Sequence, residues 1–215
     1  MPFFITGEHS DFPSVELADQ DGLLAIGGKL TFERLIDAYQ KGIFPWNNVD
    51  EPVCWYCPDP RFILFPENLR VSHSMRSIIN KKKFTFSINS AFTEVIKNCR
   101  VANRKGEGGT WITDEIEDAY TMLFTKGFAH SAEAWLENKL VGGLYGVQMG
   151  KVFFGESMFA HESNASKFAF INYVRAMEEN GIELIDCQVY TSHLVSLGAE
   201  LIPRKKFTRL LERLI

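Results

Sequence analysis

Residues 140–189, LVGGLYGVQMGKVFFGESMFAHESNASKFAFINYVRAMEENGIELIDCQV, decide the fold of this chain. Their alternating apolar side chains favour strands, and Met149-Gly150 suits a tight turn because Gly tolerates a positive φ. Ser163 and Asn164 are good N-cap residues, and Gly181 is a typical helix end. The stretch therefore predicts a hairpin, a helix and one more strand, over Leu140–Gln148, Lys151–Phe159, Ser163–Gly181 and Ile182–Val189.

Three polar side chains interrupt these apolar strands. Glu156 lies in the middle of the second hairpin strand, and Asp186 and Gln188 lie two residues apart in the last strand. Residues two apart point to one face of a strand, roughly 7 Å from each other, while Ile185 and Cys187 point to the other face. An unpaired buried charge is costly, so each carboxylate needs a partner or a chemical role. The pattern predicts that adjacent strands aim the three polar groups into one apolar setting.

The rest of the chain predicts an α+β fold. A strand at Ala129–Leu136 precedes the hairpin, so that three consecutive strands, a helix and a further strand make a mixed sheet. This order of elements is that of an acetyltransferase-like (GNAT) domain. Turn residues and prolines up to Pro66 indicate a boundary near residues 60–68. We therefore expect a small N-terminal α/β domain at 1–64 and an acetyltransferase-like mixed-sheet domain at 65–215.

Other helices are predicted from their first residues. Thr31, Ser72, Ser90 and Thr113 each precede a segment with helical apolar spacing, and each can serve as an N-cap. The C-terminal segment Arg204–Leu214 carries inward-facing apolar residues at helical spacing. Helices are therefore expected at or near these five positions, and a short one at Ser192–Leu197.

The composition limits the class of protein. With 46% hydrophobic and 13% aromatic residues, the 215-residue chain can bury a sizeable core. No apolar run approaches the ~18–20 residues that a membrane span needs, and the N-terminus lacks the features of a signal peptide, so we expect a cytoplasmic protein. Cys54 and Cys57 have C-x-x-C spacing, but no second ligand pair follows and Pro58 comes at once. Packed thiols are expected there, and no metal or other cofactor.

Positive charge is clustered although the net charge is −4. Arg76, Lys81, Lys82 and Lys83 belong to one of three basic clusters. Local basic patches on an acidic protein can serve one polyanionic ligand without general adhesion, so these four residues are candidates for phosphate contacts. A solvated helix face is the alternative for any single cluster.

An acetyltransferase-like domain normally binds acyl-CoA through a loop of the type R-x-x-G-x-G/A after its fourth strand. At that position this chain reads MFAHESNASK, without glycine. The backbone then cannot approach a pyrophosphate in the usual way, so we expect an acyl donor other than CoA. A small-molecule N-acetyltransferase that uses acetyl-CoA and a non-catalytic RNA-binding module are the alternatives.

Short motifs along the chain carry a resemblance. Between about residues 22 and 203 the sequence contains, in order, GLLAIGGKL, KGIFPW, PDPR, GTWIT, LVGGLYGV, GESMF, NASK, LIDCQ and SLGA. Together these motifs resemble the leucyl/phenylalanyl-tRNA–protein transferase family. The resemblance implies transfer of Leu or Phe, and Met more weakly, from aminoacyl-tRNA to the α-amino group of proteins with N-terminal Arg or Lys. This transfer creates a degradation signal of the bacterial N-end rule pathway, with no cofactor, membrane or DNA involved.

The resemblance also implies roles for single residues. Trp46 and Trp111 would hold the 3′-terminal adenosine of the tRNA by stacking, which is worth ~1–3 kcal/mol per base. Leu144 stands where Met is familiar in the family, and Tyr173 where Phe is; both keep bulk. The pocket for the Leu or Phe side chain would be lined by Leu144, Phe153, Tyr173 and Ile185.

The polar residues suit aminolysis of an ester. The aminoacyl ester is already activated, so transfer needs a neutral, well-placed amine and no covalent intermediate. A protein α-amino group has a pKa of ~7.7–8.0, and Asp186 hydrogen-bonded to Gln188 could orient it and help deprotonate it. Glu156 and Asp186 offer negative charge to a cationic acceptor. As alternatives, these carboxylates could be structural buried groups, and Trp46 and Trp111 core aromatics.

Overall fold

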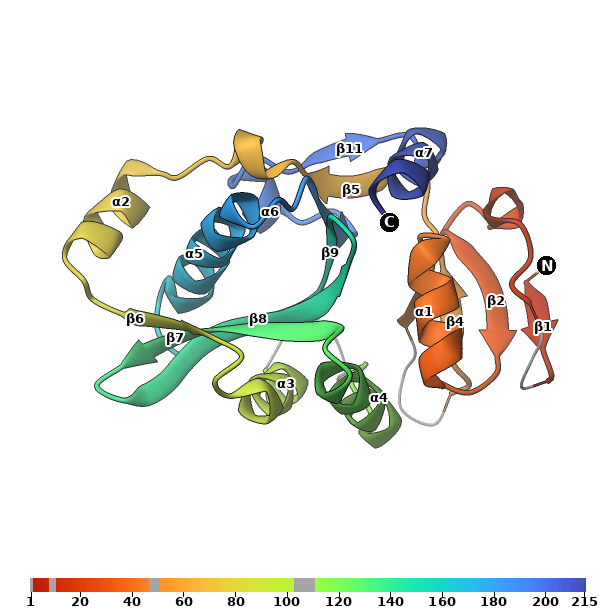
Figure 1. Ribbon diagram of the computed structural model, residues 1–215, viewed down its shortest axis with the longest axis horizontal. Coiled ribbons are helices and arrows are strands. Elements are labelled where there is room, and N and C mark those ends of the chain that lie inside the picture. The colour runs from red at the N-terminus through yellow and green to blue at the C-terminus, as the bar shows by residue number, and fades with distance from the viewer. Residues whose placement is uncertain (1, 8–10, 47–50, 103–110) are drawn as a thin grey trace.

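The structure is a computed structural model that describes residues 2–7, 11–46, 51–102 and 111–215. Its N-terminal part forms a four-stranded sheet with a helix beside it (Figure 1). The elements are β1 (Phe3–Ile5), η1 (Val15–Leu17), β2 (Leu23–Gly27), α1 (Phe32–Gln40), β3 (Phe44–Trp46) and β4 (Cys54–Tyr56). The strand order is β1-β2-β4-β3, in which β1 and β2 run parallel and the other neighbours antiparallel.

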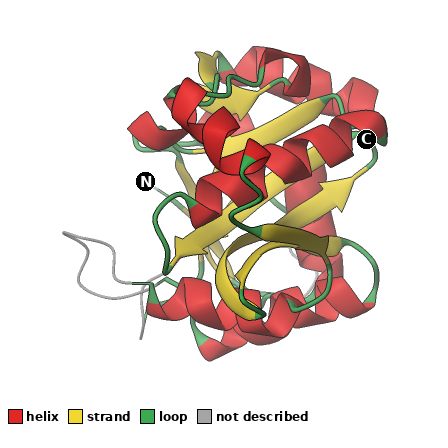
Figure 2. Cartoon of the chain, turned by 90° about the vertical axis from the view of Figure 1, so that its left-hand side faces the viewer, coloured by secondary structure: helices red, strands yellow, loops and turns green. Residues whose placement is uncertain are grey.

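The remainder forms a seven-stranded mixed sheet with helices on both sides (Figure 2). Its elements are β5 (Arg61–Leu64), η2 (Pro66–Asn68), α2 (His73–Asn80), β6 (Thr85–Ile88), α3 (Phe92–Val101), α4 (Asp114–Thr125), β7 (Ala129–Leu136), β8 (Lys139–Met149), β9 (Val152–Ala160), α5 (Ala165–Glu179), β10 (Leu184–Gln188), α6 (Ser192–Val195), β11 (Glu200–Ile202) and α7 (Arg204–Leu214). The strand order is β11-β5-β10-β9-β8-β7-β6, with only β9 and β10 parallel. The predicted α+β fold is confirmed, and β7, β8, β9, α5 and β10 follow the acetyltransferase-like order.

The residues 140–189 form the predicted hairpin, helix and strand. The hairpin turn depends on Gly150, whose φ is 52° and whose hypothetical Cβ would lie 2.3 Å from the carbonyl oxygen of Leu214. Asn164 occupies the N-cap of α5 with a left-handed φ of 68°, and its side chain makes no capping bond to the helix. The element order was thus readable from the sequence, whereas the entry into α5 is not the side-chain cap expected of Ser163 or Asn164.

Three of the four other predicted N-caps are confirmed, whereas Ser90 does not cap α3, whose N-cap position is taken by Ala91 without a side-chain bond. The side-chain oxygens of Thr31, Ser72 and Thr113 each accept a hydrogen bond from the backbone N–H three residues later, at 3.3, 3.2 and 3.3 Å. These bonds satisfy N–H groups that have no partner inside a helix. The caps therefore fix the first residues of α1, α2 and α4.

Two apolar layers cover the faces of the large sheet. α5 and α2 pack over one face, above Leu144, Phe153 and Ile185. α3 and α4 pack over the other face, and α1 packs against α4. The ring of Tyr39 in α1 lies 5.0 Å from that of Phe154 in β9. The core of the N-terminal part is thus continuous with the second layer, so α1 helps to form the wall behind β9.

The change from the small sheet to the large sheet falls between Tyr56 and Arg61, while the division into domains at 1–64 and 65–215 stays a prediction. Residues Arg61–Leu64 form β5, which pairs with β10 on one side and β11 on the other, inside the large sheet. Prolines at 58, 60 and 66 flank this strand, and proline weighs against an internal strand in sequence reasoning. Because the prolines lie just outside the paired residues, the ladder is not interrupted. The N-terminal sheet ends with Tyr56, and the large sheet begins at Arg61.

Candidate active site

Two parallel strands separate and leave an opening in the large sheet. β10 pairs with β9 only along Leu184–Asp186 and Val152–Phe154. Past these residues β9 continues beside β8, and β10 continues beside β5. Parallel strands that part at their carboxyl ends leave backbone and side chains of both strands facing a common space. A cavity of about 420 Å³ lies there.

Both strands are irregular where they face this cavity. In β9 the register shifts between the pairs Tyr145–Ser157 and Gly146–Gly155, so Glu156 is an extra residue in its strand. In β10 the register shifts at Cys187, and Gln188 adopts a positive φ of 61°. Extra residues in a strand redirect side chains. The two irregularities turn Glu156 and Gln188 toward each other, which simple alternation along regular strands does not describe.

Three of the four residues predicted to line an aminoacyl pocket lie in the apolar wall of the cavity. Leu144, Phe153 and Ile185 line the cavity, together with Met158 and Phe170, which the sequence analysis did not name. Tyr173 is not among the lining residues. Its ring meets that of Phe153 edge-on, with centroids 5.1 Å apart, and Tyr173 is 4% exposed. It therefore supports the wall from behind and does not form its surface.

The two predicted adenosine-binding tryptophans come together at the cavity. Trp46 at the end of β3 and Trp111 before α4 both line it, with ring centroids 5.9 Å apart and planes inclined by 35°. They are 65 positions apart in the sequence, so only the tertiary fold pairs them. Because the indoles contact each other, a base would stack on one face of the pair unless the rings moved apart.

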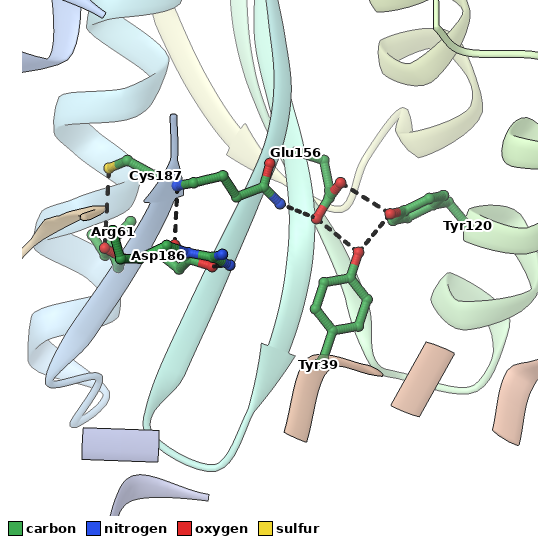
Figure 3. Close-up of polar contacts among 8 residues, drawn as sticks. Tyr39, Arg61, Tyr120, Glu156, Asp186 and Cys187 are labelled. Carbon is green, nitrogen blue, oxygen red and sulfur yellow. Dashed lines mark hydrogen bonds and ion pairs between the residues drawn. The ribbon is translucent and has the colours of Figure 1, made fainter. Parts of the chain in front are cut away.

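Glu156 is surrounded by hydrogen-bond donors (Figure 3). Its Oε1 accepts bonds from the hydroxyl of Tyr39 at 2.7 Å and from Nε2 of Gln188 at 2.9 Å. Its Oε2 accepts a bond from the hydroxyl of Tyr120 at 2.9 Å. Both tyrosines are fully buried, whereas Glu156 is partly exposed at the cavity wall. Glu156 is therefore paired with three neutral hydrogen-bond donors and not with a cation.

These surroundings set the ionisation of Glu156. Burial, together with the nearby Asp186 carboxylate, raises the pKa of Glu156 to about 7, against the donor bonds from Tyr39, Tyr120 and Gln188, which lower it. Burial also raises the pKa of both phenols well above the usual value, and the negative charge of Glu156 acts in the same direction. Glu156 is thus the group of this cluster that changes charge near neutral pH.

Asp186 is held by a residue that the sequence analysis did not single out. Arg61 of β5 donates from Nε to Oδ1 at 2.8 Å and from a terminal nitrogen to Oδ2 at 2.6 Å. Both side chains have no solvent exposure. The guanidinium carbon of Arg61 lies 4.7 Å from the ring centroids of both Phe44 and Phe207. Burial lowers the pKa of Arg61, but the charge and hydrogen bonds of Asp186, with smaller effects of Cys57 and Glu156, raise it, so the net pKa lies above its usual value and the guanidinium stays charged.

Gln188 joins the two carboxylates. Its backbone N–H donates to Oδ1 of Asp186 at 3.0 Å, while its side-chain amide donates to Glu156. The three polar residues therefore converge, as predicted, whereas Ile185 and Cys187, which were expected on the other face, belong to the apolar cluster under α5 and also line the same cavity. The hydrogen bond to Glu156 uses the side-chain nitrogen of Gln188. The side-chain oxygen of Gln188 is therefore the atom that can accept a hydrogen bond from a substrate N–H.

A second, smaller cavity adjoins the first. Its volume is about 280 Å³, and Trp46 and Val189 line both cavities. Burial raises the pKa of Tyr56 in its wall, and the negative charges of Asp19, Asp21 and Glu51 add to this effect. The field at this cavity is therefore negative. Its lining residues are Asp21, Phe44, Trp46, Glu51, Cys54, Tyr56, Pro58 and Val189.

The four predicted phosphate contacts lie on α2 and the turn after it. Arg76, Lys81, Lys82 and Lys83 are exposed. The amino group of Lys83 lies 3.4 Å from a carboxylate oxygen of Glu162, an exposed pair of small energetic weight. α2 packs on α5, which also lines the cavity through Phe170. The cluster is thus accessible to a polyanion, but it is not part of the cavity wall.

The cysteine pair shows the packing expected of it. Cys54 and Cys57 are free thiols, and burial raises the pKa of both.

Within the described ranges, no group of three or more His, Cys, Asp and Glu side chains is placed to hold a metal ion. Likewise, no helix there is long and apolar enough to cross a membrane.

Family models match most of the chain. The model of leucyl/phenylalanyl-tRNA protein transferase matches residues 63–212, and the model of the N-terminal domain of that family matches residues 28–59. The chain belongs to the leucyl/phenylalanyl-tRNA–protein transferase family. The break between the two matches covers residues 60–62, which include the first residues of β5, the strand that begins the large sheet.

Relatives in this family are similar over nearly their whole length. The leucyl/phenylalanyl-tRNA–protein transferase of Christiangramia forsetii is 52% identical over 211 residues, which are 97% of this chain and 99% of that protein. The protein of the same name from Syntrophus aciditrophicus is 50% identical over 213 residues, 99% of this chain and 89% of that one. The resemblance that the motifs indicated is confirmed.

Solved structures of low sequence identity have a limited similarity to this chain. L-PGS from Bacillus licheniformis has a TM-score of 0.44 at 15% identity, over 80% of this chain and 57% of that one. An aminoglycoside acetyltransferase from an uncultured soil metagenomic sample, in complex with sisomicin, has a TM-score of 0.41 at 16% identity, over 63% of this chain and 90% of that one.

Proposed function

We propose that this transferase moves Leu or Phe, and Met more weakly, from aminoacyl-tRNA to the α-amino group of proteins that begin with Arg or Lys. The reaction would take place in the cytoplasm and mark those proteins for N-end rule degradation. The observation that carries the proposal is the cavity of about 420 Å³, in which an apolar wall, a polar cluster and two indoles meet. Cavities of this size and lining are typical of small-ligand sites.

The donor would occupy the cavity in an orientation set by its own chemistry. The apolar side chain of the aminoacyl group fits the wall of Leu144, Phe153 and Ile185, where burial stabilises it by ~25 cal/mol per Å². The 3′-terminal adenosine would stack on Trp46 or Trp111 at the other wall. The ester bond then lies between these ends, next to Glu156 and Gln188.

Transfer would proceed by direct attack of the acceptor amine on the ester carbonyl. The ammonium of the acceptor loses a proton, its lone pair forms the C–N bond, and the ribose oxygen leaves with a proton to become a hydroxyl. One proton is released for each amide formed. Gln188 would orient the amine through its amide oxygen, and Glu156 would accept the proton because its pKa of about 7 lies close to that of the amine.

Asp186 would hold Gln188 in place and would not accept the proton. Its two oxygens accept two bonds from Arg61 and one from the backbone of Gln188. A carboxylate engaged in this way is a poor proton acceptor, because protonation would break a buried ion pair. We assign to Asp186 and Arg61 the positioning of Gln188, and proton transfer to Glu156.

The second cavity supports an acceptor with a cationic first side chain. It adjoins the transfer cavity at Trp46 and Val189, and its carboxylates Asp21 and Glu51 stand beside the ring of Tyr56. Carboxylates and aromatic faces are the groups that attract guanidinium and ammonium ions. Arg or Lys at the acceptor N-terminus would extend into this cavity while its α-amino group remains near Gln188.

Phosphates of the tRNA would contact Arg76, Lys81, Lys82 and Lys83. Each phosphate neutralised by a basic side chain makes the affinity more dependent on salt. Replacing these residues should therefore raise KM for aminoacyl-tRNA and flatten its salt dependence, without changing KM for the acceptor.

The direct test is incubation with radiolabelled Leu-tRNA and two peptides that differ only at the first residue. We expect label in the peptide that begins with Lys and none in the one that begins with Ala. Absence of label in both would overturn the proposal.

A Trp111→Ala variant should raise KM for Leu-tRNA about tenfold or more, as loss of one stacking contact predicts. An unchanged KM would remove the stacking role.

The alternative of an acetyl-CoA-dependent enzyme has its own test. No glycine lies in the segment after β9 that would cradle a pyrophosphate. CoA should therefore leave the melting temperature unchanged, whereas a stable analogue of leucyl-adenosine should raise it. A rise with CoA would favour the alternative.

A further inference from the structure

Three oxygen-bearing side chains form a closed ring behind the cavity wall. The hydroxyl oxygens of Tyr39 and Tyr120 lie 2.5 Å apart, and they lie 2.7 and 2.9 Å from the two carboxylate oxygens of Glu156 (Figure 3). The three residues come from α1, α4 and β9, so three separate elements of the fold meet at this point. Only Glu156 lines the cavity, while both phenols are fully buried.

The ring has more oxygen–oxygen contacts than protons when Glu156 is ionised. Each phenol brings one proton, and an ionised Glu156 brings none, so two protons serve three oxygen–oxygen contacts. If both phenols donate to Glu156, no proton remains between Tyr39 and Tyr120, although their oxygens are within hydrogen-bond distance. A protonated Glu156 adds a third proton, and every contact of the ring then has one. The ring is therefore complete with one proton more than the ionised form contains.

The surroundings keep both forms accessible. The side-chain amide of Gln188 donates to the ionised carboxylate at 2.9 Å, and the two phenols do so as well. Burial and the charge of Asp186 act against the ionised form. The guanidinium of Arg61 is committed to Asp186. On the side of β8, the phenol ring of Tyr145 packs edge-on against that of Tyr120. The ionised and neutral forms of Glu156 are consequently close in free energy.

We propose that Glu156, Tyr39 and Tyr120 act together as the proton acceptor of the transfer reaction, with Glu156 as the catalytic residue and the two tyrosines as positioning residues. This inference rests on the proposed function. The acceptor R–NH3⁺ and Glu156–COO⁻ become R–NH2 and Glu156–COOH, and the proton closes the ring. The amine then forms the C–N bond, its second proton goes to the departing ribose oxygen, and the ring returns its own proton to solvent.

The surroundings of the two carboxylates explain why Glu156, and not Asp186, takes up the proton. Asp186 is neutralised by Arg61, and a proton added to it would break the ion pair. Glu156 has only neutral donors, so protonation merely reverses the direction of one hydrogen bond. The phenols would hold the carboxyl group in one rotamer in both states, so that the oxygen that faces the amine does not move away when it is protonated.

The test is the pH dependence of kcat for Tyr39→Phe and Tyr120→Phe, measured with a peptide that begins with Lys and saturating Leu-tRNA. Loss of one hydroxyl removes a donor to the carboxylate and should move the acid limb upward by about one to two pH units. Tyr190→Phe is the matched control, because Tyr190 is exposed and packs on Phe62. An acid limb that stays in place in both variants would overturn the proposal.

A second measurement does not depend on turnover. Infrared difference spectroscopy of the wild-type protein should show a protonated carboxyl band that appears as the pH falls through about 7 and is lost in Glu156→Gln. The band should move in frequency and midpoint in Tyr39→Phe. If wild-type protein transfers no Leu but shows this titration, the ring stands and the proposed substrates fail. If transfer occurs without a band near this pH, the ring fails alone.

Discussion

The guanidinium of Arg61 and the carboxylate of Asp186 form a two-bond ion pair from which solvent is completely excluded. The pair joins β5 to β10, two strands separated by more than a hundred residues in sequence. The guanidinium carbon of Arg61 lies 4.7 Å from the ring centroids of Phe44 and Phe207, so the N-terminal part, the large sheet and α7 all meet at Arg61. Because Asp186 also accepts the backbone N–H of Gln188, this pair connects global stability with the geometry of the site.

Breaking this pair should destabilise the protein strongly. We expect Arg61→Met to lower the free energy of unfolding by ~3–5 kcal/mol, because it leaves Asp186 charged and buried without its cation. The exposed pair Lys151–Glu183 provides the control, and Lys151→Met should cost no more than ~1 kcal/mol. Urea denaturation measures both. Adding Asp186→Leu to Arg61→Met should recover part of the loss, and strictly additive losses would contradict the ion-pair account.

Ionisation of Glu156 should oppose folding above neutral pH. Burial raises the pKa of Glu156 from 4.5 to about 7. Between these values the folded chain binds more protons than the unfolded chain, so the stabilisation by the neutral form is complete below pH 4.5 and is lost as the pH rises through about 7. Glu156→Gln imitates the neutral form. It should exceed wild type in stability at pH 8 by ~1–3 kcal/mol, with the lower value favoured by partial exposure.

Thermal or urea unfolding at two pH values measures this effect, and the difference between variant and wild type should shrink at pH 5. The same variant should transfer no Leu, since it cannot take up a proton. A constant stability difference across this pH range would show that Glu156 does not titrate there.

The proximity of Glu156 and Gln188 could be predicted because its signals lie within the strands that carry the two residues. Both residues break apolar strands, and the order of elements made those strands neighbours. The role of Arg61 could not be predicted in this way. Its strand is short and flanked by prolines, and its partner Asp186 is 125 residues away. The roles of Tyr39 and Tyr120 could not be predicted for another reason: each lies at an apolar position of its helix, where an aromatic ring is expected in the core. Nothing local indicates that their hydroxyls converge on one carboxylate.

Two glycines beside Phe153 should respond very differently to the same change. A Cβ on Gly146 would lie 2.1 Å from the carbonyl oxygen of Phe154 and 2.5 Å from the ring of Phe153, whereas a Cβ on Gly155 meets nothing closer than 3.5 Å. Gly146→Ala should therefore displace β9 and the Phe153 side of the cavity. We expect a loss of stability of ~2–4 kcal/mol and a weaker preference for Leu over other aminoacyl groups.

Gly155→Ala is the matched control for that experiment, and it should fold with a change of less than ~1 kcal/mol. Because Gly155 lines the cavity, its variant can still alter kcat. Chemical denaturation separates the two cases, and equal stability losses for both variants would contradict the close packing of β8 on β9 at Gly146.

The acidic side cavity should select the acceptor without acting on the donor. Asp21 and Glu51 contribute negative charge next to Tyr56 and Trp46. Asp21→Asn and Glu51→Gln should each raise KM for a peptide that begins with Lys by about 2- to 5-fold, as expected for partly exposed charge pairs. KM for Leu-tRNA and the kcat at saturation should stay the same. Glu16→Gln, on the exposed η1, is the control and should change none of these values. If the double variant Asp21→Asn/Glu51→Gln discriminates Lys from Ala peptides as well as wild type does, recognition of the first side chain lies elsewhere.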